Sequence, residues 1–178
     1  AFGGLNKIEF GGSSAITVTP IIITPERKQN LQDHLIMFFT GLARNASDIA
    51  AEQIKKTPQK ESELKKMREM VDKAVDILNS RKSINEFGRL LHQSWLLKRS
   101  LTSKISSQHI DEIYQTGLKA GALGGKLLGA GGGGFILFFA KPEVQPKLKE
   151  KFKSLVHVPF VFENAGSQII HYSTHDLF

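Results

Sequence analysis

Residues Lys126 to Ala140 read KLLGAGGGGFILFFA, and this stretch decides how the surrounding chain must fold. Five of the six residues from Gly129 to Gly134 are glycine, and an apolar run from Phe135 to Ala140 follows at once. A short apolar run bounded by glycines is typical of a buried strand. The glycines therefore lead directly into a predicted core, where they could hold a phosphate, link two domains or form a tight turn.

Two nucleotide-binding motifs can be excluded for these glycines. Gly129, Gly131 and Gly134 match the spacing G-x-G-x-x-G, but that motif follows a strand and opens a helix whose N-terminal N–H groups hold the pyrophosphate. Here we expect a helix, then the glycines, then a strand, so the Rossmann interpretation is rejected. The Walker pattern G-x-x-x-x-G-K-[ST] also fails, because Phe135 stands where lysine is required.

A flexible linker is excluded as well, because linkers join domains whereas these glycines adjoin an apolar strand. Two interpretations remain open. The glycines could form a tight crossing, at which only glycine lets two backbones approach each other. Alternatively, successive bare N–H groups could line a concave anion site, to which Lys126 adds a point charge.

Apolar runs bounded by turn residues predict short strands along the chain. Gly11 to Ser14 separates the first two runs as in a hairpin, because glycine and serine supply turns. Pro20 indicates an edge position, since proline has no N–H for a strand ladder. The expected strands are Leu5–Phe10, Ala15–Ile23, Leu35–Phe39, Phe135–Ala140, Val158–Glu163 and Ser167–Ser173.

Apolar residues at three- and four-residue steps predict amphipathic helices, most clearly from Glu61 to Asn79. Ser83 and Glu86 match a capping box, and Gly121 is suited to a left-handed helix stop because it has no Cβ. The expected helices are Arg44–Lys56, Glu61–Asn79, Ser83–Arg99, Ser107–Ala120 and Pro142–Leu155. Together these elements predict an α+β fold in which helices pack on an antiparallel sheet.

Composition narrows the classes of function. Hydrophobic residues make up 40% and charged residues 23% of the chain, as in soluble globular proteins, and no apolar stretch approaches the roughly 20 residues of a membrane helix. The absence of cysteine excludes disulfides and agrees with a cytoplasmic location. The net charge of +7 lies mostly on predicted polar helix faces without interleaved aromatics, so we expect neither a nucleic acid nor a membrane as partner.

The chain opens with Ala1-Phe2-Gly3-Gly4 and has no initiator methionine. Residues typical of a strand follow at once. We therefore expect it to be the C-terminal part of a longer polypeptide, whose other half supplies residues that are not seen here.

Three stretches of the chain resemble the GHMP kinase superfamily: Met37–Ile49 (MFFTGLARNASDI), Leu91–Ser106 (LHQSWLLKRSLTSKIS) and Gly121–Phe139 (GALGGKLLGAGGGGFILFF). Within the last, KLLGAGGGGF is similar to the third signature motif of that superfamily, which lies near the C-terminal end. Together the stretches resemble the sugar-phosphate branch, and within it the D-glycero-D-manno-heptose 7-phosphate kinases. The resemblance covers essentially all 178 residues.

This resemblance implies a division into two parts. Residues 1–30 would be a strand hairpin that belongs to the preceding N-terminal domain, and residues 31–178 would be the GHMP kinase C-terminal domain. Gly11-Gly12-Ser13-Ser14 is similar to the main phosphate loop of the family, but no helix follows it, so a hairpin turn is expected there. The main phosphate loop, the magnesium ligands and the catalytic aspartate would lie in the missing N-terminal half.

The resemblance also implies an activity. The full-length protein would transfer the γ-phosphoryl group of ATP, with Mg²⁺, to the anomeric hydroxyl of a heptose 7-phosphate in nucleotide-heptose biosynthesis. This chain by itself would be inactive, and a homodimer is left open. The alternatives are a galactokinase-like or fucokinase-like member, or a non-catalytic binding or dimerisation domain with the same fold.

The expected cofactor site is the glycine-rich segment, which would contact the β- and γ-phosphates of ATP. Thr40, Gly41 and Arg44 lie between a strand and a helix and are expected to bind the acceptor, with Arg44 gripping its phosphate unless it is merely a surface arginine. The residues expected at the ATP phosphates are Lys126, Gly129, Ala130, Gly131, Gly132, Gly133 and Gly134.

No catalytic or metal-binding residue is assigned from the sequence. Asp33, Asp48 and Asp111 are available, but nothing in their setting suggests a general base. The histidines lack the spacing of a metal site, and His34 and His92 are expected to be ordinary core or surface residues. Lys98 and Arg99 end a predicted helix, where cations offset the helix dipole.

Overall fold

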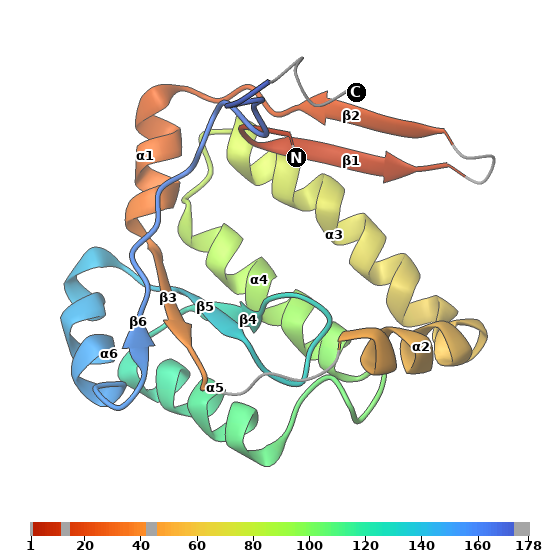
Figure 1. The fold of residues 1–178 in the computed structure, drawn as a ribbon. Coiled ribbons are helices and arrows are strands. Elements are labelled where there is room, and N and C mark those ends of the chain that lie inside the picture. Colours follow the sequence, from red (N-terminus) through yellow and green to blue (C-terminus); the bar gives the residue numbers. More distant parts are fainter. Residues whose placement is uncertain (1, 12–14, 42–45, 173–178) are drawn as a thin grey trace. The chain divides into compact units, whose positions relative to one another are not determined.

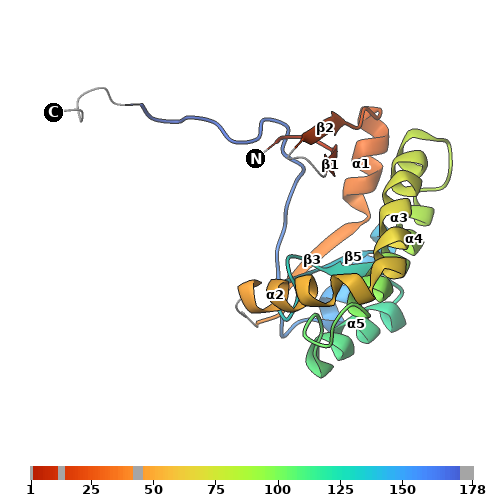
Figure 2. The ribbon, with the colours of Figure 1, turned by 90° about the vertical axis from the view of Figure 1, so that its right-hand side faces the viewer.

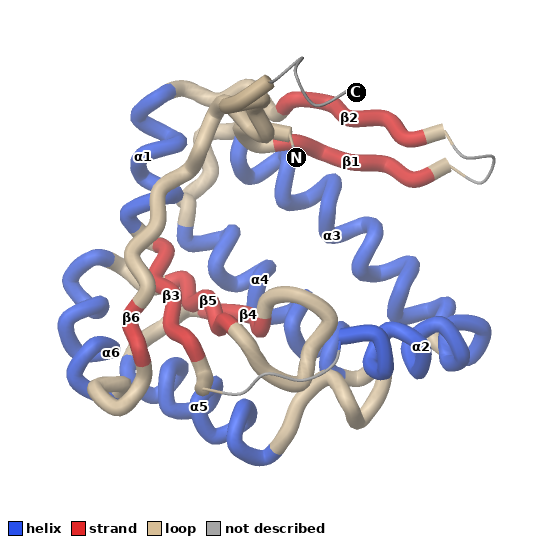
Figure 3. Tube along the Cα trace, viewed as in Figure 1, coloured by secondary structure: helices blue, strands red, loops and turns tan. Residues whose placement is uncertain are grey.

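The computed structural model describes residues 2–11, 15–41 and 46–172, and its elements are shown in Figures 1 and 3. Contacts divide the chain into two compact units. One consists of Ala1–Ile22 with Val161–Phe178, and the other is Ile23–Phe160. The larger unit contains a four-stranded sheet and all of the helices found in the described residues.

The sheet of the larger unit is antiparallel throughout and has the strand order β4-β5-β3-β6. Phe39 of β3 lies opposite Phe135 of β5, and Leu127 of β4 lies opposite Ile136. These pairs confirm the predicted antiparallel sheet and its two central strands. The bounds are β3 Leu35–Phe39, β4 Gly124–Leu127, β5 Phe135–Phe139 and β6 Val156–His157.

The predicted closing pair of strands is wrong. The chain forms only the short strand β6, and the described residues from 158 to 172 form no strand. The N–H of Val158 still donates to the carbonyl of Met37 at 2.9 Å, but Pro159 has no N–H with which to extend the ladder.

Strand β4 is the main element that the sequence did not reveal. A helix was expected directly before the glycines, whereas the preceding helix ends at Ala120 and Gly121 caps it with φ +116°. The glycine-rich segment thus joins two antiparallel neighbours, β4 and β5, as the loop of a hairpin. A Rossmann motif needs a helix after its glycines, whereas here the strand β5 follows them. The Rossmann interpretation is therefore still rejected, although a strand and not a helix precedes the glycines.

The helices agree with the predicted ones in position, with small shifts at their ends. The helix predicted over Glu61–Asn79 is confirmed at both ends, whereas the last helix stops at Lys151, earlier than predicted. Two 3₁₀ turns, Thr57–Gln59 and Pro142–Val144, adjoin α2 and α6. The helices are α1 Pro25–Asp33, α2 Ala46–Lys56, α3 Glu61–Asn79, α4 Asn85–Arg99, α5 Gln108–Ala120 and α6 Gln145–Lys151.

Helix α1 was not predicted, although its start carries a local signal. The hydroxyl of Thr24 accepts a hydrogen bond from the N–H of Arg27 at 3.2 Å, and Pro25 occupies the first turn. Leu31 is the buried residue of this helix, so no apolar periodicity marks it in the sequence. At α4, the predicted capping box is wrong, because the Ser83 hydroxyl accepts from Asn85 and caps no N3 donor.

The core of the larger unit lies between the sheet and helices α4 and α5. Trp95 of α4 and Phe138 of β5 are almost fully buried, at 1% and 0% exposure. The ring of Phe138 stacks on Phe152 at 5.5 Å and lies 6.0 Å from Tyr114, so β5 is covered by aromatic side chains. Helices α3 and α4 pack side by side, as Figures 1 and 2 show.

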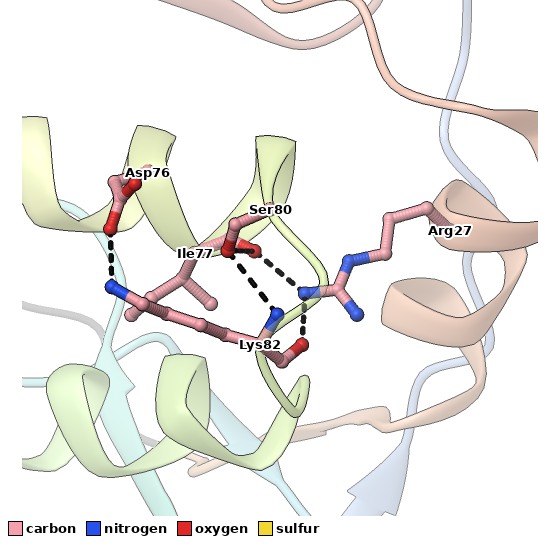
Figure 4. A network of polar contacts seen from close by, with 5 residues as sticks. All are labelled: Arg27, Asp76, Ile77, Ser80 and Lys82. Atoms are coloured by element: carbon pink, nitrogen blue, oxygen red, sulfur yellow. Dashed lines mark hydrogen bonds and ion pairs between the residues drawn. The ribbon is translucent and has the colours of Figure 1, made fainter.

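Arg27 ties α1 to the turn between α3 and α4 (Figure 4). One of its terminal nitrogens donates to the carbonyl oxygens of Ile77 at 2.6 Å and Lys82 at 2.8 Å. The hydroxyl of Ser80 donates to the same Ile77 carbonyl at 3.4 Å, and Lys82 pairs with Asp76 at 2.5 Å. The bonds to Ile77 satisfy a carbonyl in the last turn of α3, which would otherwise lack an intrahelical partner.

The smaller unit contains the predicted hairpin. Strands β1 Asn6–Phe10 and β2 Ile16–Pro20 pair antiparallel, with Phe10 opposite Ile16. The N–H of Gly4 donates to the carbonyl of Glu163 at 2.8 Å, so the chain after Val161 returns to this unit. The turn residues 12–14 lie outside the described residues, and the assignment of residues 1–30 to another domain remains a prediction. In the described ranges, none of the helices has the length and apolar character that a bilayer crossing requires.

We expect Gly124→Ala to disrupt the packing of β4 on α4. A Cβ at this position would lie 2.1 Å from the carbonyl oxygen of Gly88 and 2.8 Å from the backbone nitrogen of His92, so backbone must move. The free energy of unfolding should fall by about 3 kcal/mol, the upper end of the overpacking range. Denaturant titration measures this change.

Gly41→Ala is the control for this prediction. Gly41 has φ +77° and no atom within 4 Å of its added Cβ, so only backbone strain of about 1 kcal/mol applies. An equal loss of stability in the two variants would contradict the close approach of β4 and α4.

Candidate functional site

The candidate site is built around the glycine loop, which we define as Gly129–Gly134 between β4 and β5. Four of its residues have left-handed backbone conformations, with φ +73° at Gly129, +127° at Gly131, +76° at Gly132 and +99° at Gly134. A Cβ on Gly131 would lie 2.8 Å from both Cα and the carbonyl oxygen of Ile105, so glycine is required there. The loop is therefore both a tight crossing and a bare stretch of backbone.

Side chains from two helices hold carbonyl groups of the loop. Lys98 of α4 donates from Nζ to the carbonyl of Gly129 at 2.5 Å. Gln53 of α2 donates from Nε2 to the carbonyl of Ala130 at 2.9 Å. Because both bonds go to carbonyl oxygens, they fix the loop without occupying its N–H groups.

Further hydrogen bonds fix the middle and the end of the loop. Thr40, which follows β3, donates to the carbonyl of Gly134 from its hydroxyl at 2.9 Å and from its N–H at 2.8 Å. The N–H of Gly132 donates to the carbonyl of Ile105 at 2.8 Å. The loop is thus preorganised by residues that are far apart in the sequence.

Most N–H groups of the loop remain available. In the described part of the chain, Gly132 is the loop residue whose N–H has a protein acceptor, and the other loop N–H groups have none. Successive free N–H groups in a turn with left-handed residues form an anion-binding concavity. The geometry therefore supports the anion site that the sequence left open, alongside the tight crossing.

Two half-buried lysines add positive charge at this loop. Lys126 lies on β4, three residues before Gly129, and burial lowers its pKa from the usual value. The pKa of Lys98 is lowered to about 8, mainly by burial and in addition by the nearby positive charge of Lys126. Among the described residues, no carboxylate contributes to either shift. The site is therefore cationic and lacks a protein counterion in the described ranges.

The predicted acceptor residues have different positions. Thr40 is buried, at 3% exposure, and its hydroxyl is used to hold Gly134. Gly41 follows it, is exposed, and has φ +77°. Arg44 lies outside the described residues. Thr40 thus positions the glycine loop, and its hydroxyl is directed to protein backbone.

The candidate acids are not arranged as a general base. Asp111 of α5 accepts two hydrogen bonds from the guanidinium of Arg99, one of them at 2.7 Å, and these bonds hold its pKa below the usual value. Ser106 donates to the same carboxylate at 2.7 Å. The side chain of Asp33 accepts from Gln29 at 2.7 Å. A carboxylate held ionised by an arginine is a weak proton acceptor.

No metal-binding cluster is found within the described ranges, where no three His, Cys, Asp or Glu side chains are arranged to hold an ion. Nδ1 of His92 lies 2.7 Å from the hydroxyl of Tyr114, and Nδ1 of His34 lies 2.8 Å from the carbonyl of Asn30. Both histidines are thus engaged with protein groups.

Lys98 and Gln53 are the site residues that sequence reasoning missed. The sequence indicates for Lys98 only the role of a helix-end cation, and it indicates no role for Gln53. A signal was available, because Lys98 follows the buried Trp95 by three residues and Gln53 follows the buried Ile49 by four. Residues at these spacings share a helix face, so the spacing predicts that both side chains lie on the face that packs against the core.

Comparison with known families matches residues 41–157 to the family described as GHMP kinases C terminal. This range includes the glycine loop and both lysines. It covers more than half of the chain.

Relatives of known function are sugar kinases. The chain is 29% identical over 143 residues to a D-glycero-alpha-D-manno-heptose 7-phosphate kinase from Campylobacter jejuni, covering 79% of the chain and 42% of that protein. It is 26% identical over 136 residues to a bifunctional fucokinase/GDP-fucose pyrophosphorylase from Arabidopsis thaliana, covering 74% of the chain and 13% of that protein. The chain therefore spans less than half the length of these relatives.

Among solved structures, the fold is similar to that of L. major mevalonate kinase in complex with R-mevalonate. The TM-score is 0.72 at 21% identity, and the match covers 93% of this chain and 51% of that one. At this identity the likeness concerns the fold.

We expect Lys126→Met to raise the pKa of Lys98 above about 8, because it removes the nearby positive charge.

The lowered pKa of Lys98 also affects stability. Since this pKa lies below the unfolded value of 10.5, the unfolded chain binds more of this proton than the folded chain does between these two pH values. The contribution of Lys98 to the free energy of unfolding therefore rises with pH across that window. NMR titration of lysine ¹³Cε signals measures the shift.

Lys119→Met is the matched control, because Lys119 is an exposed lysine of α5 that causes no shift at Lys98. A pKa of Lys98 that stays unchanged in Lys126→Met would show that the two ammonium groups do not interact.

Proposed function

The chain belongs to the GHMP kinase family through its C-terminal domain, and from this premise we propose that the full-length protein transfers the γ-phosphoryl group of ATP to a sugar hydroxyl. The observation that carries the proposal is the glycine loop, whose free N–H groups lie beside two lysines. Kinase relatives that act on sugars support the same activity.

The loop suits a polyphosphate for physical reasons. Its free N–H groups donate without a side chain in the way, and the bonds from Thr40 and Gln53 keep it in one conformation. Donors that are fixed in advance stabilise charge on phosphate oxygens without reorganisation during the reaction. We assign Lys126 and the residues Gly129–Gly134 to the β- and γ-phosphates of ATP.

Mg²⁺ would supply neutralisation of phosphate charge when bound with ATP. The described residues offer no cluster of carboxylates or histidines that fits such an ion. No residue of this chain is therefore assigned to it, and no general base is assigned either.

The acceptor would bind next to the loop. Thr40 joins the end of β3 to Gly134, so the exposed Gly41 that follows lies close to the loop. We assign Gly41 and Arg44 to the acceptor, with the Arg44 guanidinium binding its phosphate through two parallel hydrogen bonds. Thr40 contributes by positioning the loop.

The relative from Campylobacter jejuni favours a heptose 7-phosphate as acceptor, phosphorylated at its anomeric hydroxyl for nucleotide-heptose synthesis. The Arabidopsis relative favours a second candidate, in which fucose is the acceptor. The absence of cysteine agrees with a reducing, cytoplasmic setting for either reaction.

An acceptor panel tests this proposal on the full-length protein. ADP release is measured with ATP–Mg²⁺ and D-glycero-D-manno-heptose 7-phosphate, fucose, galactose or mevalonate, and the product is identified by ³¹P NMR. We expect turnover with the heptose 7-phosphate and a new anomeric phosphate signal. Turnover with fucose alone would contradict the heptose 7-phosphate proposal and support the second candidate. No turnover with any acceptor would favour a non-catalytic binding domain.

A second prediction concerns the loop itself. Gly132 has φ +76° and donates its N–H to Ile105, so Gly132→Ala strains the loop and redirects its donors. We expect kcat to fall about 10²-fold, as when one fixed donor is lost from an active site. Steady-state kinetics and thermal unfolding are measured together.

Gly121→Ala provides the comparison, because Gly121 also has a left-handed conformation, φ +116°, but caps α5 outside the loop. Both variants should lose about 1–2 kcal/mol of stability. An equal fall of kcat in both would mean that lost stability, and not the loop, accounts for the effect.

A further inference from the structure

We propose that Lys98 is a further phosphate-binding residue, which forms with Lys126 and the glycine loop a two-lysine site for one phosphate dianion. This proposal rests on the proposed function in placing the site in a kinase, and it adds a residue from helix α4. The ligand class is a phosphate group with two negative charges.

The first argument is position. Lys98 is in the last turn of α4, and its Nζ lies 2.5 Å from the carbonyl oxygen of Gly129, the first residue of the loop. Lys126 of β4 lies close enough to Lys98 for its charge to act on that residue. The close approach of Gly124 to the backbone of α4 holds these two elements together. The two ammonium groups are therefore presented to the loop from a rigid support.

The second argument is charge. Two half-buried ammonium groups that repel each other are unfavourable unless an anion compensates them. Within the described residues, the bond from Lys98 goes to a neutral carbonyl, and no carboxylate acts on either lysine. Other clustered lysines differ, since Lys56 and Lys104 both pair with Glu52, at 3.1 and 2.9 Å. The counterion of the two-lysine site is accordingly expected to be a ligand.

The helix dipole does not account for Lys98. Cations in the last turn of a helix are favourable at the surface, and Arg99 is exposed there and pairs with Asp111. Lys98 is instead turned inward to the loop and loses hydration, which the dipole alone does not require. Its position is explained by a phosphate that contacts the free N–H groups of the loop.

A phosphate at this site has a measurable consequence. Lys98 has a pKa of about 8, and Lys126 from β4 is the charged group whose field acts on it among the described residues. A dianion nearby favours the protonated form and raises this pKa. Phosphate binding near pH 8 is therefore linked to proton uptake by Lys98.

Calorimetry of the full-length protein tests the proposal. Binding of a non-hydrolysable ATP analogue, of mannose 6-phosphate and of inorganic phosphate is measured at pH 8 in two buffers with different ionisation enthalpies. We expect uptake of up to about half a proton for the ligand that occupies the site, since Lys98 is about half protonated at this pH. Uptake with the nucleotide alone assigns the site to ATP, and uptake with the sugar phosphate alone assigns it to the acceptor.

Two substitutions separate this role from a structural one. Lys98→Met should weaken binding about tenfold or more and abolish the proton uptake. Lys98→Arg should retain binding but also abolish the uptake, because arginine stays protonated. Lys119→Met, an exposed lysine of α5, should change neither quantity.

Unchanged proton uptake in Lys98→Met, or no uptake with any of the three ligands, would overturn the proposal. These results are separable from the kinase assay. Proton-linked phosphate binding without turnover on any sugar would contradict only the proposed function. Turnover with unaltered binding and proton linkage in Lys98→Met would contradict only the role of Lys98.

Discussion

The backbone contact between β4 and α4 is the constraint on which the site depends. At Gly124 a single Cβ would come within 2.1 Å of the carbonyl oxygen of Gly88, so the strand and the helix can meet only through a residue without a side chain. Strand β4 begins at this contact and ends at Leu127, shortly before the glycine loop. The contact also holds Lys126 and Lys98 on two elements that cannot shift far relative to each other.

Beyond β4, the glycine loop is held by hydrogen bonds to three of its carbonyl groups and from one of its N–H groups. Lys98, Gln53 and Thr40 each donate to a loop carbonyl, and Ile105 accepts from Gly132. The remaining N–H groups are left without acceptors among the described residues. A loop can bind an anion through its backbone only if its N–H groups are not used by other acceptors. Here most of the bonds that fix the loop go to its carbonyl oxygens, so most of its N–H groups stay free.

The charge of Lys98 and Lys126 favours an anionic ligand at the loop. Burial makes both lysines costly to keep charged, and mutual repulsion adds to that cost. A polyphosphate relieves the repulsion and is the ligand class that kinases of this family require. Asp111, by contrast, is paired with Arg99, and this pairing holds its pKa below the usual value.

The sequence by itself determined the elements with a strong local period. Helix α3, strands β3 and β5, and the membership suggested by KLLGAGGGGF could be derived from the order of residues, because apolar spacing and motif spacing are local properties. Tertiary structure alone decided the rest. Gly124 and Gly125 give β4 no apolar period, Pro159 cuts off β6, and Thr40 and Lys98 acquire their roles from residues far along the chain. Those partners meet only when the sheet forms, so no local pattern could specify them.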